Sequence, residues 1–276
     1  MAGIAPKTIN RLSNGSASEV SNRTSEAIAT FCQPGTPGAS YFTDQTILCV
    51  RGSKASRCCL PCTETILEMK TSLEHWQAAW LALGASTASE ELYHQLVACY
   101  SEPHRKYHTM QHLNECLTHL ESVRALADHA DEVELALWFH DAIYDTSKKD
   151  NEKRSAEWAR DSVLAAGVSS EKADRIYELI MATMHNAVPV GRDAEVLVDI
   201  DLGILGARAD RFDDYEMQVR EEYSWVPDSL YRAARRQVLE QFVNREWIYS
   251  TEFFRTKYEA RARENLARSL ARLRTD

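Results

Sequence analysis

Apolar residues recur at helical spacing along most of the chain. Trp76 and Trp80 lie four residues apart, and Leu92, Leu96 and Cys99 follow one another at steps of four and three. Such steps place the apolar side chains on one face of a helix. Alternating apolar and polar runs joined by hairpin turns, which mark strands, do not occur. The pattern predicts an all-α fold, a single helical bundle, with helices over residues 69–83, 87–100, 110–129, 131–145, 151–167, 169–185, 193–206, 211–223, 227–245 and 254–274.

The first 68 residues differ from the rest in composition. Stretches such as RLSNGSASEVSNRTSE and CQPGTPGAS are rich in Ser, Gly, Pro and Asn, and none of the six tryptophans precedes Met69. Such a segment cannot bury enough apolar surface to offset the entropy lost on ordering. We expect residues 1–68 to be a disordered leader and residues 69–276 to be the folded domain. Alternatively, Met69 is the true first residue and the leader is not part of the native protein.

The cysteines do not indicate a redox or zinc site. Cys59 and Cys62 have CxxC spacing, but a zinc knuckle needs a second pair at suitable spacing, which the sequence lacks. Their thiols are expected to stay reduced. Cys99 and Cys116 fall in apolar helical patterns and are expected in the core.

The net charge is −9. This charge argues against binding to a nucleic-acid polymer or an anionic membrane, because both need a basic face. No apolar run reaches the roughly 20 residues of a membrane span, and the N-terminal stretch lacks a secretory signal. A cytoplasmic protein is therefore expected. A small phosphate ester held in a locally positive pocket is compatible with this charge.

Four ionisable residues lie where apolar residues are expected. His140 and Asp141 are adjacent in LWFHDAIYD, and Asp199 and Asp201 lie in VLVDIDLGIL. Buried carboxylates are costly unless a cation or hydrogen-bond donors compensate them. A divalent metal ion would offset that cost for the whole set.

Three further histidines extend this set. His108 and His112 are four residues apart, so both face the same side of a helix or of its entry turn. His185 ends the apolar stretch IMATMH. A single histidine on an apolar face is more often a core residue than a ligand, but together with the paired acids these residues predict a metal site.

The order His, His-Asp, Asp resembles the HD superfamily of metal-dependent phosphohydrolases. The stretch YHTMQH is also similar to the YHNxxH entry of cyclic-nucleotide phosphodiesterases, a remote relative. The blocks EPHRKYHTMQHL, FHDAIYD, NEKRSA, DIDLGILG and REEY, taken in order, resemble a bacterial group of predicted HD phosphohydrolases over residues 70–274. The resemblance implies an all-α bundle with the metal near its centre.

The resemblance also implies roles for individual residues. The metal ligands would be His112, His140, Asp141 and Asp201, with Asp201 preferred to Asp199 because it precedes a leucine. Asp141 would also orient the attacking water. His108 would protonate the leaving group, although Thr109 stands where the phosphodiesterase pattern has Asn. Mixed His and Asp ligation suits Mn, Fe, Co, Ni, Zn or, less well, Mg.

Weaker candidates border these motifs. They could bind a second metal ion or contact substrate, and they comprise His185, Asp145, Asp199, Arg105, Lys148 and Arg154. The sequence does not fix the number of ions, the substrate or the oligomeric state.

The expected function is metal-dependent hydrolysis of a phosphate ester or anhydride, with a small nucleotide-like substrate. One alternative is an HD-type di-iron oxygenase, which uses additional histidines before the last Asp, where this chain has only His185. A ferritin-like di-iron site needs ExxH on two helices, and only Glu91 to His94 fits. The other alternative is a catalytically silent bundle that binds metal or ligand.

The change in composition at Met69 predicts that residues 1–68 are dispensable. A chain beginning at Met69 should bind metal and melt at the same temperature as the full chain, because the leader adds no core. Circular dichroism melts and elemental analysis of both chains test this expectation. A large loss of stability or of metal from the shorter chain would contradict it.

Overall fold

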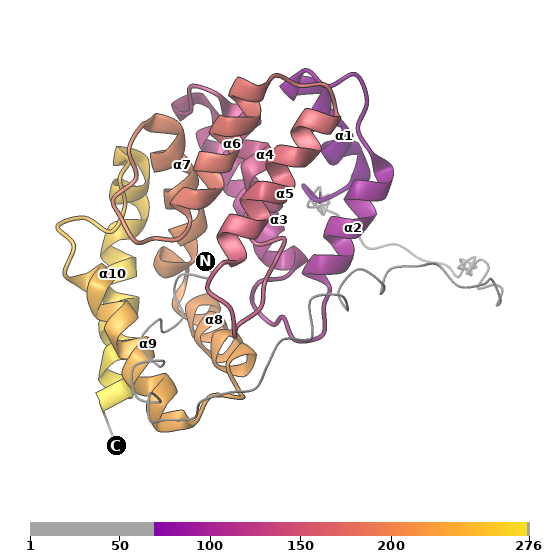
Figure 1. The fold of residues 1–276 in the computed structure, drawn as a ribbon. Coiled ribbons are helices and arrows are strands. Elements are labelled where there is room, and N and C mark those ends of the chain that lie inside the picture. Colours follow the sequence, from indigo (N-terminus) through magenta and orange to yellow (C-terminus); the bar gives the residue numbers. More distant parts are fainter. Residues whose placement is uncertain (1–68, 275–276) are drawn as a thin grey trace, which may run out of the picture. The chain divides into compact units, whose positions relative to one another are not determined.

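The computed structural model describes residues 69–274, and these residues form ten α-helices and two 3₁₀ turns, with no strand among them (Figure 1). The all-α prediction is confirmed. The predicted leader and the Cys59–Cys62 pair lie outside the described residues. The elements are α1 Leu73–Leu83, α2 Glu90–Tyr100, α3 Met110–Val123, η3 Arg124–Leu126, α4 Ala130–Phe139, α5 Asn151–Ala165, α6 Ser170–Ala182, α7 Arg192–Asp201, η4 Leu202–Gly206, α8 Ala209–Glu222, α9 Asp228–Val243 and α10 Glu252–Arg274.

Helix α4 lies among its neighbours and contacts α1, α3, α5, α6 and α7 (Figure 1). Its residues from Leu135 to Phe139 are all buried, as expected of a helix that is apolar on every side. Trp138 packs edge-on against Trp76 of α1, with ring centroids 5.1 Å apart. The residues that follow α4 are therefore held deep in the core.

Helix α4 ends at Phe139, six residues before the end that the apolar pattern predicts at residue 145. The Arg105 guanidinium donates to the carbonyls of Asp141 at 2.6 Å and Ala142 at 2.9 Å. These carbonyls are satisfied without further helical turns. The His-Asp pair therefore lies in a turn at the end of the helix, where both side chains can point the same way.

The other predicted acid pair also lies at a helix end. Helix α7 stops at Asp201, and the 3₁₀ turn η4 replaces the predicted continuation to residue 206. Tyr249 donates to Leu202 O at 3.1 Å, and Asn265 donates to the carbonyls of Leu205 and Ala207, each at 2.9 Å. These buried donors fix the backbone that follows Asp201.

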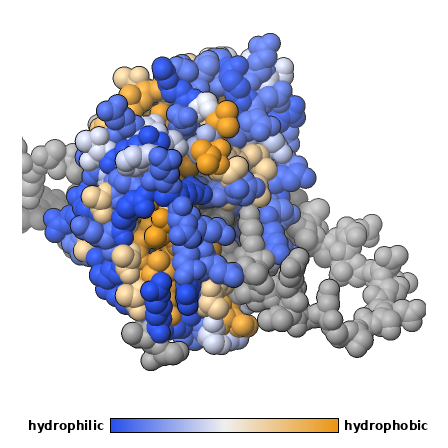
Figure 2. All heavy atoms as spheres, turned by 90° about the vertical axis from the view of Figure 1, so that its left-hand side faces the viewer, coloured by the Kyte–Doolittle hydropathy of each residue, from blue (hydrophilic) through white to orange (hydrophobic). Residues whose placement is uncertain are grey.

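The surface in Figure 2 is mostly hydrophilic, and hydrophobic side chains show as a narrow strip in the lower half of the view and as separate small patches near the top. The most exposed large apolar residues include Val188, Val190 and Met217. None of the helices between residues 69 and 274 is long and apolar enough to span a membrane.

Gly206 permits the close approach of η4 to α10. A Cβ at this position would lie 2.8 Å from the backbone oxygen of Tyr258 and 2.9 Å from the Tyr249 hydroxyl. We predict that Gly206→Ala lowers the free energy of unfolding by about 1–3 kcal/mol, the usual cost of overpacking. Gly203→Ala is the matched control, because its Cβ would contact two side chains, His119 at 3.1 Å and Phe254 at 3.7 Å, and no backbone atom among its nearest neighbours. Urea denaturation measures both variants, and an equal loss in the two would contradict the packing argument.

Candidate metal centre

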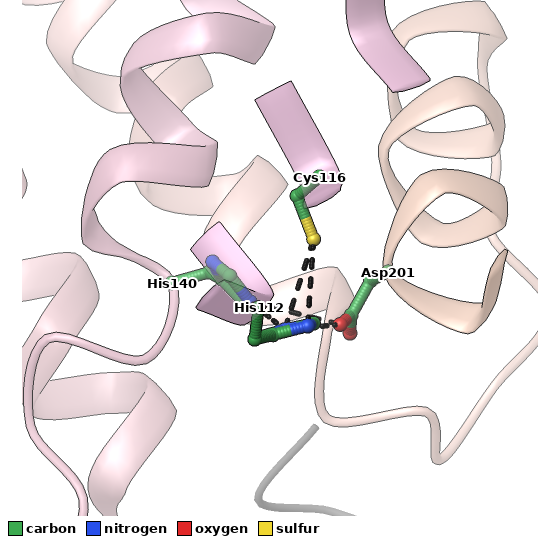
Figure 3. Close-up of side chains that lie close together, drawn as sticks. All are labelled: His112, Cys116, His140 and Asp201. Atoms are coloured by element: carbon green, nitrogen blue, oxygen red, sulfur yellow. Dashed lines mark hydrogen bonds and ion pairs between the residues drawn. The ribbon is translucent and has the colours of Figure 1, made fainter. Parts of the chain in front are cut away.

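Side chains from three helices converge on one buried point. His112 and Cys116 come from α3, His140 follows α4, and Asp201 ends α7 (Figure 3). One ligand atom from each of the four lies within 4.8 Å of the others, and all four residues are buried. This cluster could hold a metal ion.

Asp141 completes the set of predicted ligands. Its Oδ2 lies 3.0 Å from His140 Nε2 and 3.5 Å from His112 Nε2. The two imidazole Nε2 atoms are 3.1 Å apart, and Asp201 Oδ1 lies 3.3 Å from His112 Nε2. The structure thus brings together all four residues that the sequence predicts as ligands, across 89 positions of the chain from residue 112 to residue 201.

The His140 ring is oriented as a metal ligand would be. Its Nδ1 lies 2.7 Å from the carbonyl oxygen of Leu137, which can only accept a hydrogen bond. Nδ1 therefore carries the proton, and Nε2 faces the cluster. A backbone carbonyl on the second ring nitrogen is the usual support of a metal-binding histidine.

The electrostatics of the cluster favour a cation. Asp141 and Asp201 both lie at helix C-termini, where the backbone dipole is negative. Burial lowers the pKa of His140, but the nearby carboxylates outweigh it and raise this pKa to about 10. Burial likewise raises the pKa of Asp141, and the charge of His140 instead holds it well below its usual range. Without metal, protons on the histidines balance the carboxylates, and a divalent ion would replace them.

Asp199 points away from the cluster. Its carboxylate accepts hydrogen bonds from Ser250 N, Thr251 N and Thr251 Oγ1, each at 2.7 Å, just before α10 begins. Burial raises its pKa to about 6. Asp201, and not Asp199, therefore belongs to the cluster, in agreement with the preference drawn from the sequence.

His185 lies beside the cluster although 44 residues separate it from Asp141 in sequence. Its Nε2 is 2.9 Å from Asp201 Oδ2, the oxygen on the far side from His112. His185 has φ 53°, a left-handed conformation unusual for a non-glycine residue and found at no other non-glycine position between residues 69 and 274. Such strain concentrates at functional sites. His185 can orient Asp201 or contribute to a second ion.

A buried carboxylate that the sequence reading missed holds His108. His108 Nδ1 lies 2.7 Å from Glu222 Oε2, and Tyr144 donates to the same oxygen at 2.8 Å. Glu222 Oε1 accepts the backbone N–H groups of Lys106, Tyr107 and His108 at 2.7 to 3.0 Å. Burial raises the pKa of Glu222, but His108 and these donors lower it to about 2. Glu222 is therefore an anion that fixes His108.

The other ring nitrogen of His108, Nε2, is not held by a hydrogen bond from residues 69–274. His108 Nε2 is buried and has no hydrogen-bond partner within the described part of the chain. The ring lies 6.0 Å from the His112 ring, centroid to centroid. An imidazole that is anchored at Nδ1 by a carboxylate and unengaged at Nε2 can give or take a proton there.

The weaker candidates lie apart from the cluster atoms. The Arg105 side chain is fully buried and binds the turn that holds Asp141, so its guanidinium supports the His-Asp pair. Asp145 accepts two hydrogen bonds from Ser147 within its own turn. Lys148 and Arg154 are exposed. Arg154 and Asp145 line a separate cavity of 680 Å³ that Glu222 borders.

Cys116 belongs to the cluster as well as to the apolar core. Its Sγ lies 3.7 Å from each ring nitrogen of His112. The sequence placed it only in the core, yet its spacing of four residues from His112 puts both on one face of α3. That spacing is the signal that could have indicated a fifth potential ligand.

Comparison with protein-family models, curated proteins and solved structures finds no match to this chain. The described domain is all-α and contains a buried cluster of His, Cys and Asp side chains that could bind metal.

The two aspartates of α7 provide a matched test of this cluster. Asp201→Asn should lose most of the bound divalent metal, because it removes a carboxylate that faces both histidines. Asp199→Asn should keep the metal and instead lower the stability, because it weakens the cap of α10. Elemental analysis of the purified wild type should find roughly one to two ions per chain, as in hydrolytic sites of this kind.

Metal retained in full by Asp201→Asn would show that the cluster is only a packing feature. Metal lost equally from both variants would mean that unfolding, and not ligand loss, explains the result. His140→Ala provides an independent check, since it removes a ligand from a different helix.

Proposed function

We propose that this protein is an HD-type metal-dependent phosphohydrolase that cleaves a phosphate ester or anhydride of a small substrate. The observation that supports this most directly is the convergence of His112, His140, Asp141 and Asp201 on one buried point. The order of these residues along the chain matches the HD pattern, and the all-α fold is compatible with it.

His112, His140, Asp141 and Asp201 would hold the metal ion, which when bound would polarise a phosphoryl oxygen and lower the pKa of water. Asp141 would also accept a hydrogen bond from the attacking water. If Cys116 joins the ligand set, its thiolate favours zinc or iron over magnesium. His185, on the outer oxygen of Asp201, would hold that carboxylate in place.

His108 would supply the proton that the leaving oxygen needs. Glu222 accepts the hydrogen bond from Nδ1, so the second proton of the imidazolium resides on Nε2. A positioned acid of this kind contributes roughly 10²- to 10⁴-fold to the rate.

The di-iron oxygenase remains the main alternative activity. In the described domain, His185 is the one additional histidine beside the acids of the cluster. The ExxH stretch of a ferritin-like site lies on α2, and Glu91 and His94 are both exposed. A silent metal-binding bundle would bind metal without turning over any phosphate ester. A screen of purified protein against phosphate esters and anhydrides, repeated with several divalent metals after stripping, distinguishes these functions.

His108 provides the sharpest test of the proposed chemistry. His108→Ala should keep the metal but slow hydrolysis of an alkyl phosphate by roughly 10²- to 10⁴-fold. The loss should be much smaller for nitrophenyl phosphate, because nitrophenolate leaves without a proton. Glu222→Gln should keep the metal and slow the alkyl ester more than the nitrophenyl ester, because it removes the carboxylate that fixes His108 Nδ1.

His112→Ala is the control, because a ligand variant should lose metal and activity together on both esters. Equal slowing of both esters by His108→Ala would remove His108 from the acid role. Metal lost from His108→Ala but retained in His112→Ala would mean that the two histidines exchange roles.

A further inference from the structure

A small cavity adjoins the cluster on the side of α3, η4, α8 and α10. It has a volume of about 260 Å³, and its lining includes three residues of the cluster, His112, Cys116 and Asp201. The same cavity is lined by the arginines Arg208, Arg211 and Arg261. The inner wall is therefore made by buried candidate metal ligands, and the outer wall by cationic side chains.

The arginines differ in how firmly they are held. Arg211 forms a two-pronged ion pair with Glu115, at 2.8 and 2.9 Å, and lies over the Tyr107 ring. Its charge is therefore matched by Glu115. Arg211 thus links α8 to α3 and is held in place by Glu115.

Arg208 and Arg261 are exposed, and their contacts are long. Arg208 meets Asp210 at 3.4 Å, where both side chains are largely in solvent. Arg261 donates to the carbonyl of Lys257 at 3.5 Å and lies over the Tyr258 ring. Weakly held surface pairs contribute little, so both guanidinium groups can turn to a ligand at small cost.

We propose that this cavity binds a second, non-reacting phosphate group of the substrate through Arg208 and Arg261. The inference rests on the proposed function, because the reacting phosphate would lie at the cluster at the inner end of the same cavity. A guanidinium fork matches the oxygens of a phosphate. The chain has a net charge of −9, which disfavours the binding of an anion elsewhere on its surface. The arginines provide a local positive charge that attracts an anionic substrate.

The size of the cavity narrows the substrate class. Pockets for drug-sized ligands usually measure about 300–1,000 Å³, and this one is smaller, at about 260 Å³. It suits a compact bisphosphorylated molecule such as a sugar bisphosphate, with one phosphate at the cluster and the other at the arginines. A dinucleotide would not fit within it.

Steady-state kinetics of the full chain loaded with metal tests the assignment. Fructose 1,6-bisphosphate and fructose 6-phosphate serve as probes that differ by one phosphate. The Arg208→Ala/Arg261→Ala double variant should raise KM for the bisphosphate by roughly tenfold per arginine, the usual worth of a charge-assisted hydrogen bond. Its kcat, and KM for the monophosphate, should stay within about twofold, inside the usual scatter of such measurements. Arg236→Ala, an exposed arginine of α9 outside the cavity lining, is the matched control.

Calorimetric titration with inorganic phosphate gives a readout that does not require turnover. Inorganic phosphate would also bind the metal ion of the cluster, so the wild type and Arg236→Ala should show two binding events. The double variant should keep the event at the metal and bind phosphate at the arginines at least tenfold more weakly. Unchanged phosphate affinity in the double variant, or a rise of KM that is equal for both esters, would overturn the proposal. If the wild type hydrolyses no ester, the proposed function fails while the titration still decides whether the arginines bind the anion.

Discussion

The structure depends on the burial of two carboxylates at the C-terminal ends of two core helices. Asp141 follows α4 and Asp201 ends α7, and both face the imidazoles of His112 and His140 at 3.0 to 3.6 Å. An ionised group taken out of water costs several kcal/mol unless a partner compensates it. The negative helix ends increase that cost. A divalent ion at the common point would compensate both acids at once.

Buried polar side chains around the cluster form hydrogen bonds with backbone segments next to it that lie outside the α-helices. Arg105 binds the carbonyls of the turn after α4, and Asn265 with Tyr249 binds those of η4. Glu222 binds three consecutive N–H groups of the loop before α3, and Asp199 binds two consecutive N–H groups before α10. Each buried polar side chain satisfies a backbone segment that helices alone leave unpaired. The chain can therefore interrupt its helices at the places where the cluster needs side chains to converge.

The sequence predicted the helices because their apolar faces repeat at helical spacing. Acids in apolar runs predicted a metal site, and the resemblance to the HD pattern implied the four residues that the structure brings together. It did not predict where α4 and α7 end. That boundary depends on Arg105, Tyr249 and Asn265, whose contacts lie 36 to 60 residues away in the chain. A local pattern cannot encode such long-range hydrogen bonds.

Two residues of the site were missed for related reasons. Glu222 lies in the REEY block of the resemblance, but that block gives it no role, and its contact with His108, 114 residues earlier, shows its part. Cys116 has an apolar character that fits the core equally well, so composition gives no reason to separate a ligand from a packing residue. Arg105 was expected near substrate because of its position in a motif, whereas its guanidinium serves the backbone of the adjacent turn.

X-ray absorption spectroscopy of the purified full-length protein reports which atoms surround a bound metal ion. We expect a first shell of nitrogen and oxygen at about 2.0–2.2 Å, with the multiple scattering of two imidazole rings, and a sulfur near ~2.3 Å if Cys116 takes part. A bound metal surrounded by oxygen alone, without imidazole scattering, would contradict the assignment of His112 and His140 as its ligands.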